Sequence, residues 1–130
     1  MKDFFLNEPE GFSNLNGVRL IGKSEDTVVV EFSIPPGNLY FDGHFPDFSL
    51  LPALAQIELA VRFSSLHFGT GVHVRDMRRV KFTRYIRPDV PLRLKLKKDE
   101  ENISFKILSP GEDEVYSTGN LTIISGGEGS

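Results

Sequence analysis

LPALAQIELAVRFSSLH, residues 51–67, is the one long helix that the sequence predicts, and it decides the fold. Pro52 suits a first helical turn, and Ser49 just upstream is a candidate N-cap. Gly69 and Gly71 can end the helix. Its apolar residues occupy nearly the whole circumference instead of one stripe, so we expect a buried helix wrapped by a sheet. These residues are Leu51, Leu54, Ala55, Ile57, Leu59, Ala60, Val61, Phe63 and Leu66.

Strand patterns lie on both sides of this helix in the chain. Residues 28–34 and 92–97 alternate between apolar and more polar side chains, and residues 103–107 and 121–123 repeat the alternation more briefly. A period of two predicts strands with one face in the core and the other in water. We therefore expect an α+β fold, with an antiparallel meander after residue 77 and one long buried central helix wrapped by a mostly antiparallel sheet.

Size and composition narrow the class of protein. A chain of 130 residues fits one domain over 1–130, with 126–130 as a loose tail. No apolar run approaches the roughly 18 residues that cross a bilayer, and residues 1–6 are too short for a signal peptide, so we expect a cytoplasmic protein with no membrane span. The lack of cysteine excludes disulfides and thiolate catalysis and fits a reducing compartment.

Two histidines carry little functional signal. His67 falls at the helix end, where a positive charge favours the dipole, and His73 lies in an expected loop. Neither has the paired spacing of a metal site, so we expect no metal.

A third histidine precedes the helix and lies at a defined spacing from a glutamate within it. His44 lies in the run Gly43-His44-Phe45-Pro46, and Glu58 follows it by fourteen residues. The helical neighbours of Glu58 are mostly aliphatic, and desolvation there raises the pKa of a carboxyl and favours the protonated acid. The alternative is an ion pair with Arg62, one turn further on, which holds Glu58 ionised.

The segment from 43 to 58 resembles the active-site pattern of the hot-dog-fold 3-hydroxyacyl-acyl-carrier-protein dehydratases. The resemblance continues more weakly through 79–82, 86–89 and 117–121, and thus covers most of the chain. The hot-dog fold is one helix embraced by an antiparallel sheet, which agrees with the pattern of elements. The residues that match in the first segment are Gly43, His44, Phe45, Pro46, Leu50, Pro52, Leu54 and Glu58.

Three positions of the segment from 43 to 58 depart from the family pattern, and the Gly that the family has between Pro88 and Asp89 is absent. Asp47 and Ala53 stand where the family has Gly, and Ser49 stands where it has Pro. These differences indicate a divergent member, similar to the aryl-polyene-type dehydratases. They also fit an alternative function, a noncatalytic hot-dog subunit that binds an acylated carrier protein or an active homologue. An acyl-thioesterase on the same fold is a third interpretation, which the run at His44 disfavours.

The resemblance implies a hydro-lyase that needs no cofactor. It would convert 3-hydroxyacyl thioesters into trans-2-enoyl thioesters in fatty-acid, polyene or polyketide-type lipid biosynthesis. His44 would remove the proton at C2, and Glu58 would protonate the hydroxyl that leaves C3. The family forms homodimers in which these two residues of one site come from opposite subunits; trimers of dimers and heteromers with a homologue stay open.

Further site residues follow from the same resemblance and from the helix. The first N–H groups of the helix, at Ala53 and Leu54, are candidates to bind the thioester oxygen. Phe41, Phe45 and Phe48 flank the matching run and are the best candidates for an acyl tunnel, although most of the eleven phenylalanines must be core.

Basic residues cluster although the net charge is −3. Ten of the fifteen Lys and Arg lie between Arg75 and Lys98, against two acidic residues. One interpretation is that these residues lie on the solvent-exposed face of half-buried strands. Another is a docking surface for an acidic partner. Nucleic acid is not expected, since no nucleic-acid motif accompanies the charge. The resemblance implies acyl carrier protein as the partner, docking at Arg78, Arg79, Lys81 and Arg84.

Overall fold

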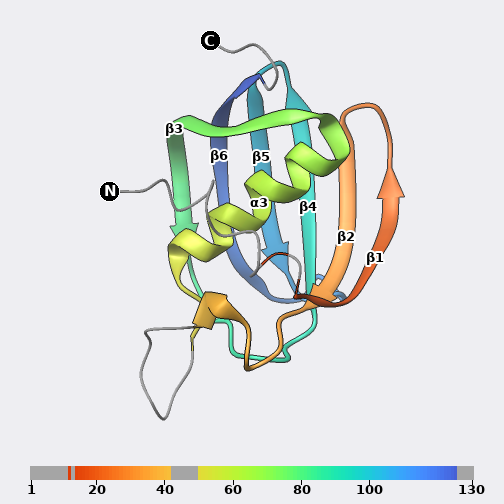
Figure 1. Ribbon diagram of the computed structural model, residues 1–130, viewed down its shortest axis with the longest axis vertical. Helices are drawn as coiled ribbons and strands as arrows, with labels where there is room; N and C mark the ends of the chain where they lie inside the picture. Colours follow the sequence, from red (N-terminus) through yellow and green to blue (C-terminus); the bar gives the residue numbers. More distant parts are fainter. Residues whose placement is uncertain (1–11, 13, 42–49, 126–130) are drawn as a thin grey trace.

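Six strands form one antiparallel sheet, and one long helix crosses a single face of it (Figure 1). The computed structural model describes residues 12, 14–41 and 50–125; the expected tail at 126–130 lies outside them. The strand order is β1-β2-β4-β5-β6-β3. The predicted α+β fold is confirmed. The elements are β1 (Asn16–Lys23), β2 (Thr27–Ser33), η1 (Leu39–Phe41), α3 (Ala53–Phe68), β3 (Thr70–Phe82), β4 (Leu92–Asp99), β5 (Asn102–Leu108) and β6 (Val115–Ser125).

The ends of α3 differ slightly from the prediction. Pro52 is itself the N-cap, with extended backbone angles and no side-chain cap, so it does not lie in the first turn. The predicted cap, Ser49, lies outside the described residues and does not hold the N-cap position. Gly69 ends the helix as predicted: its φ of 74° is left-handed, and its N–H donates to the Ser65 carbonyl oxygen at 3.0 Å.

Burial of α3 is complete only in its middle. Residues 55–61 are all buried, so the helix is enclosed there, as its apolar circumference predicts. Leu54 and Leu66 are 54 % and 64 % exposed, which contradicts the expectation that every apolar residue of the helix is covered. Both belong to the terminal turns of α3. No helix among the described residues is long and apolar enough to span a membrane.

The strands with clear alternation are confirmed as β2, β4, β5 and β6. The predicted meander is correct for β4, β5 and β6. It is wrong for β3, which does not pair with β4, because β2 and β5 already occupy both edges of that strand. Instead, β3 pairs with β6. The strand β1 was not predicted. His73 lies in β3, not in a loop.

Gly119 on β6 lies directly under an aromatic ring. It is the register partner of Phe105 on β5, whose side chain is 3 % exposed. A Cβ atom at position 119 would lie 2.7 Å from Phe105 Cε2 and 3.0 Å from Val80 Cγ2. The glycine therefore makes room for the buried ring, and no larger residue fits without displacing it.

Gly119→Ala should destabilise the protein by about 1–3 kcal/mol, the usual cost of overpacking a core. The measurement is the free energy of unfolding from urea denaturation at fixed protein concentration. Gly22→Ala, also in a strand, is the matched control, because a Cβ there meets nothing within 4 Å. It should change stability by no more than about 0.5 kcal/mol. Equal losses in the two variants would contradict the close approach.

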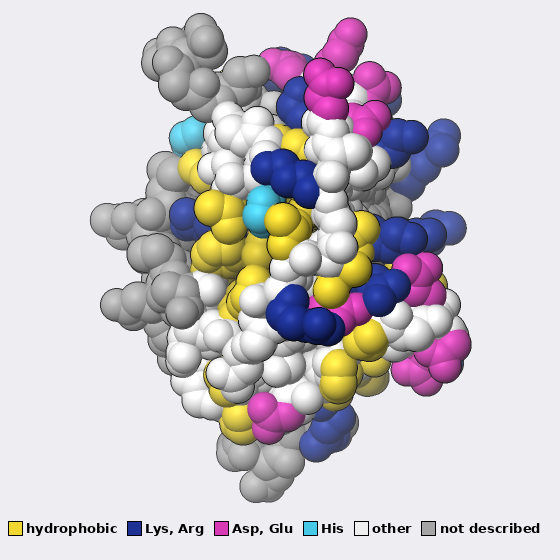
Figure 2. All heavy atoms as spheres, turned by 90° about the vertical axis from the view of Figure 1, so that its right-hand side faces the viewer, with side chains coloured by type: hydrophobic (Ala, Val, Ile, Leu, Met, Phe, Trp, Pro, Cys, Tyr) yellow, Lys and Arg dark blue, Asp and Glu magenta, His cyan; other side chains and the backbone are white. Residues whose placement is uncertain are grey.

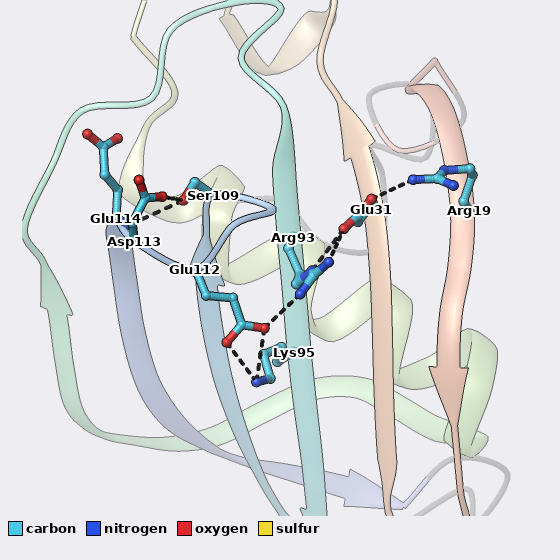
Figure 3. Close-up of polar contacts among 8 residues, drawn as sticks. All are labelled: Arg19, Glu31, Arg93, Lys95, Ser109, Glu112, Asp113 and Glu114. Atoms are coloured by element: carbon cyan, nitrogen blue, oxygen red, sulfur yellow. Dashed lines mark hydrogen bonds and ion pairs between the residues drawn. The ribbon is translucent and has the colours of Figure 1, made fainter.

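An ion-pair network lies on the face of the sheet that α3 does not cover (Figure 3). Arg19 Nη2 contacts Glu31 Oε1 at 2.6 Å, and Arg93 Nε contacts Glu31 Oε2 at 2.8 Å. Glu112 accepts from Arg93 Nη1 at 2.7 Å and from Lys95 Nζ at 3.3 Å. Hydrogen bonding from Arg93 is the main cause that lowers the pKa of both carboxyls. The network links β1, β2 and β4 to the turn before β6.

This network predicts a loss of stability in acid. Because the folded pKa of Glu31 lies below its ordinary value of 4.5, its contribution is complete at neutral pH and disappears as the pH falls through the folded pKa. Glu31→Gln should therefore be less stable than wild type at pH 7, and the difference should shrink below pH 4.5. Urea midpoints at several pH values measure this, and a difference that stays constant with pH would disprove it.

Candidate active site

Glu58 is a fully buried carboxyl in the middle of α3. The Tyr40 hydroxyl donates to its Oε2 at 3.2 Å, and Arg62 Nε contacts the same oxygen at 3.4 Å. The ion pair with Arg62, the alternative that the sequence left open, is thus present. Burial disfavours an ionised carboxylate, whereas the guanidinium and the hydroxyl favour it, so these influences oppose each other.

Tyr40 is a residue of this site that sequence reasoning missed. It belongs to the short helix η1, and its side chain is 4 % exposed. The buried Asn38 holds this turn, since its Oδ1 accepts from the Tyr40 N–H at 2.7 Å and its Nδ2 donates to the Asn14 carbonyl oxygen at 3.0 Å. A signal existed: the chain has three tyrosines against eleven phenylalanines, and Tyr40 stands directly before Phe41 and shortly before the run at His44.

A cavity of about 480 Å³ lies at the N-terminal end of α3. Residues 50–53 and Gln56 form one wall, and residues 82–85, the last residue of β3 and the segment after it, form the other. A hydrogen bond of 2.8 Å from the Leu51 N–H to the Ile86 carbonyl oxygen joins the first wall to the residue that follows the second. Ala53 is part of the wall, so the N-terminus of the helix faces a space that a ligand can occupy.

The other predicted site residues either lie away from the cavity wall or fall outside the described residues. Leu54 is exposed and Phe41 is buried in the core, and neither belongs to the cavity wall. His44, Phe45 and Phe48 lie outside the described residues.

Glu58 does not line this cavity either. On a helical wheel it lies about 200° from Gln56, on the opposite side of α3. The described part of one chain therefore holds two separate features, a buried carboxyl and a cavity at the helix start.

Two groups can be distinguished among the basic residues. Arg78, Arg79 and Lys81 are exposed on β3, where the register with β6 shifts and Arg79 has a φ of 55°. Arg84 lines the cavity, and Arg78 contacts Asp76 at 3.0 Å. The second group is the ion-paired one of the network. Figure 2 shows this interleaving: acidic side chains lie among the Lys and Arg at the right of the view. Arg78, Arg79, Lys81 and Arg84 thus form a basic stretch on β3 and the segment after it.

His67 does not behave as a charged helix cap. Its ring stacks on Phe63 with centroids 6.3 Å apart, and burial, aided by the charge of Lys23, lowers its pKa. The lowered pKa favours the neutral imidazole, which weakens the favourable charge expected at the helix end. Within residues 12, 14–41 and 50–125, no group of three or more His, Asp or Glu side chains is placed to hold a metal.

The chain matches one family model and is similar in structure to several known proteins. A model of an ApeI-like family, described as ApeI dehydratase, matches residues 21–120. The dehydratase heterocomplex ApeI:P from Xenorhabdus doucetiae has a chain of similar structure, with a TM-score of 0.71 and 24 % identity over 82 % of this chain and 97 % of its own. No curated protein matches.

Two further solved structures have the same fold. Zebra fish thioesterase superfamily member 2 has a TM-score of 0.65 and 10 % identity, covering 93 % of this chain and 91 % of its own. The dehydratase domain from the CurJ module of curacin polyketide synthase has a TM-score of 0.61 and 19 % identity, covering 85 % and 42 %. At such identities these likenesses establish the hot-dog fold alone.

Proposed function

Because the chain belongs to the ApeI-like dehydratase family, we propose that it removes water from 3-hydroxyacyl thioesters of acyl carrier protein to give trans-2-enoyl thioesters. The observation that carries this proposal is the family match over residues 21–120, which includes both His44 and Glu58. The reaction needs a base, an acid and donors for the thioester oxygen, and the chain offers candidates for all three.

The proposed mechanism assigns one proton transfer to each residue. His44 takes the proton from C2, the C3–O bond breaks, and Glu58 gives its proton to the departing hydroxyl, so that water leaves. The first N–H groups of α3, beginning at Ala53, stabilise the charge on the thioester oxygen. In the reverse direction Glu58 acts as a carboxylate that takes a proton from water, and the contacts with Arg62 and Tyr40 support that form.

The proposed assembly is a pair of subunits joined along β3. This strand is 13 residues long, forms an edge of the sheet, and exposes Met77 and Phe82 at 50 % and 41 %. The cavity and Glu58 lie on different sides of α3, which supports a site that takes His44 and the cavity from one subunit and Glu58 from the other. Acyl carrier protein docks at the neighbouring basic residues Arg78, Arg79, Lys81 and Arg84. A homologue can replace the second copy, as the heterocomplex ApeI:P suggests.

Two observations favour other functions. Ala53 adds a methyl group to the cavity wall, which fits a noncatalytic subunit that binds acyl chains without converting them. The contact between Arg62 and Glu58 supports a carboxylate, which an acyl-thioesterase uses to activate water.

Hydration of a short trans-2-enoyl thioester tests the proposal directly. Loss of the conjugated absorbance reports hydration, and a thiol reagent in a parallel sample reports hydrolysis. Loss of absorbance without thiol release, absent in His44→Ala, is the expected result. Thiol release would identify a thioesterase. No conversion of several chain lengths, including carrier-bound ones, would favour the noncatalytic subunit.

A further inference from the structure

Two hydrogen-bond donors from different elements converge on one oxygen of Glu58. The Tyr40 hydroxyl, from η1, lies 3.2 Å from Oε2, and Arg62 Nε, one turn further along α3, lies 3.4 Å from the same atom. Glu58 is fully buried and Tyr40 is 4 % exposed, so bulk water has little access to this contact. The carboxyl is therefore held from two sides at Oε2.

This arrangement makes the two oxygens of Glu58 chemically different. A guanidinium can only donate hydrogen bonds, and a protonated carboxyl carries its hydrogen on one oxygen. A hydrogen on Oε2 would point at the N–H of Arg62, whereas a hydrogen on Oε1 lets Oε2 accept from both donors. The acid form of Glu58 therefore carries its proton on Oε1.

The backbone around Tyr40 is fixed by hydrogen bonds of its own. The Tyr40 N–H donates to Asn38 Oδ1 at 2.7 Å, and the Phe41 N–H donates to the Asn38 carbonyl oxygen at 3.0 Å. The N–H of Asn38 in turn donates to the Pro35 carbonyl oxygen at 3.0 Å. Because the turn is already ordered, little conformational entropy is lost when the Tyr40 hydroxyl meets Glu58.

We propose that Tyr40 is a positioning residue of the dehydration site, which together with Arg62 commits Oε2 of Glu58 to accepting hydrogen bonds and makes Oε1 the oxygen that exchanges the proton. This inference rests on the proposed function and adds a residue to it. During dehydration the Oε1–H bond breaks, and the proton joins the hydroxyl that leaves C3 with the C–O electron pair. The carboxylate that remains shares its negative charge with Oε2, where Tyr40 and Arg62 donate.

A simpler role for Tyr40 is structural, since a buried tyrosine hydroxyl usually has a hydrogen-bond partner. The two roles predict different outcomes for Tyr40→Phe, which removes only the hydroxyl group. A structural role lowers the stability of the protein and nothing else. A positioning role also raises the pKa of Glu58, because the carboxylate loses a donor that favours its charged form.

Titration of Glu58 by ¹³C NMR tests this without any turnover. The glutamates are labelled at the side-chain carboxyl carbon, and the Glu58 signal is the one that is missing in Glu58→Gln. Its midpoint in Tyr40→Phe should lie about one pH unit or more above that of wild type, as expected for a lost hydrogen bond to a charged acceptor. Tyr116→Phe is the matched control, because the Tyr116 hydroxyl donates to a different carboxyl, Glu114, at 3.5 Å. It should leave the midpoint of Glu58 unchanged.

Equal midpoints in Tyr40→Phe and wild type would overturn the inference. If Tyr40→Phe does not fold, wild type decides: a ¹³C label at Cζ of Tyr40 should shift at the midpoint of Glu58, and a signal that stays constant there would overturn it.

The hydration assay then tests the role of the contact in the reaction. The limb of the pH profile of kcat/KM that Glu58 sets should move in Tyr40→Phe by the same amount as the NMR midpoint. A shifted midpoint with an unmoved limb would overturn the role of Tyr40 alone. A wild-type chain that hydrates no enoyl thioester would instead overturn the proposed function, so the two failures are distinct.

Discussion

Glu58→Gln is expected to lower the rate of enoyl-thioester hydration by about 10²- to 10⁴-fold, the usual value of one positioned proton transfer. Glutamine keeps the size of the side chain and can still accept from the Tyr40 hydroxyl, but it can neither give nor take the proton. The measurement is kcat/KM from the loss of conjugated absorbance, together with thermal melting to show that the variant is folded.

The control for this change is Glu101→Gln. The Glu101 side chain is 43 % exposed and contacts Arg75 at 3.2 Å, so the substitution removes the same charge at a residue that does not line the cavity. Its hydration rate should equal that of wild type. If Glu58→Gln retained more than about a tenth of wild-type activity, Glu58 would not be the acid and base of the reaction.

Phe63→Ala is expected to cost about 3–5 kcal/mol of unfolding free energy, as the loss of a fully buried aromatic side chain usually does. The Phe63 ring is 1 % exposed and lies 4.7 Å from the ring of Phe12 and 5.3 Å from that of Phe32, between centroids. It therefore ties α3 to the chain before β1 and to β2. Urea denaturation at one fixed protein concentration measures the loss.

Leu66→Ala is the matched control, because Leu66 lies on the same helix and is 64 % exposed. It should change stability by no more than about 0.5 kcal/mol. If Phe63→Ala does not fold, Phe63→Leu should still lose stability relative to this control. Equal stability of the Phe63 and Leu66 variants would mean that α3 is not held by the aromatic contact.

Much of the fold was predictable because the buried strands keep a strict period of two. In β2 and β4 every second side chain is buried for most of the strand, and the sequence shows this alternation directly. The strand β1 has no buried residue, and its register with β2 shifts twice, so its pattern carries no period. Bulges interrupt β3 in the same way. Edge strands of this kind are formed by pairing, which the sequence pattern does not report.

The candidate site was predictable only in part. Spacing identified Glu58, and proximity along the helix identified Arg62 as its possible partner. Tyr40 is eighteen residues from Glu58 in the chain, and the two meet only because η1 folds back on α3. The cavity at the start of α3 takes one wall from residues 82–85, which lie far along the chain from the helix start, so no local pattern could indicate it.

The ring of Phe105 fills the space that any side chain at position 119 would need, which limits the order in which this protein can evolve. A lineage can enlarge residue 119 without losing stability only after residue 105 or residue 80 has become smaller. Substitutions on β5 and β6 should therefore occur in a fixed sequence of steps, and relatives with a bulkier residue at 119 should carry a smaller one across the strand.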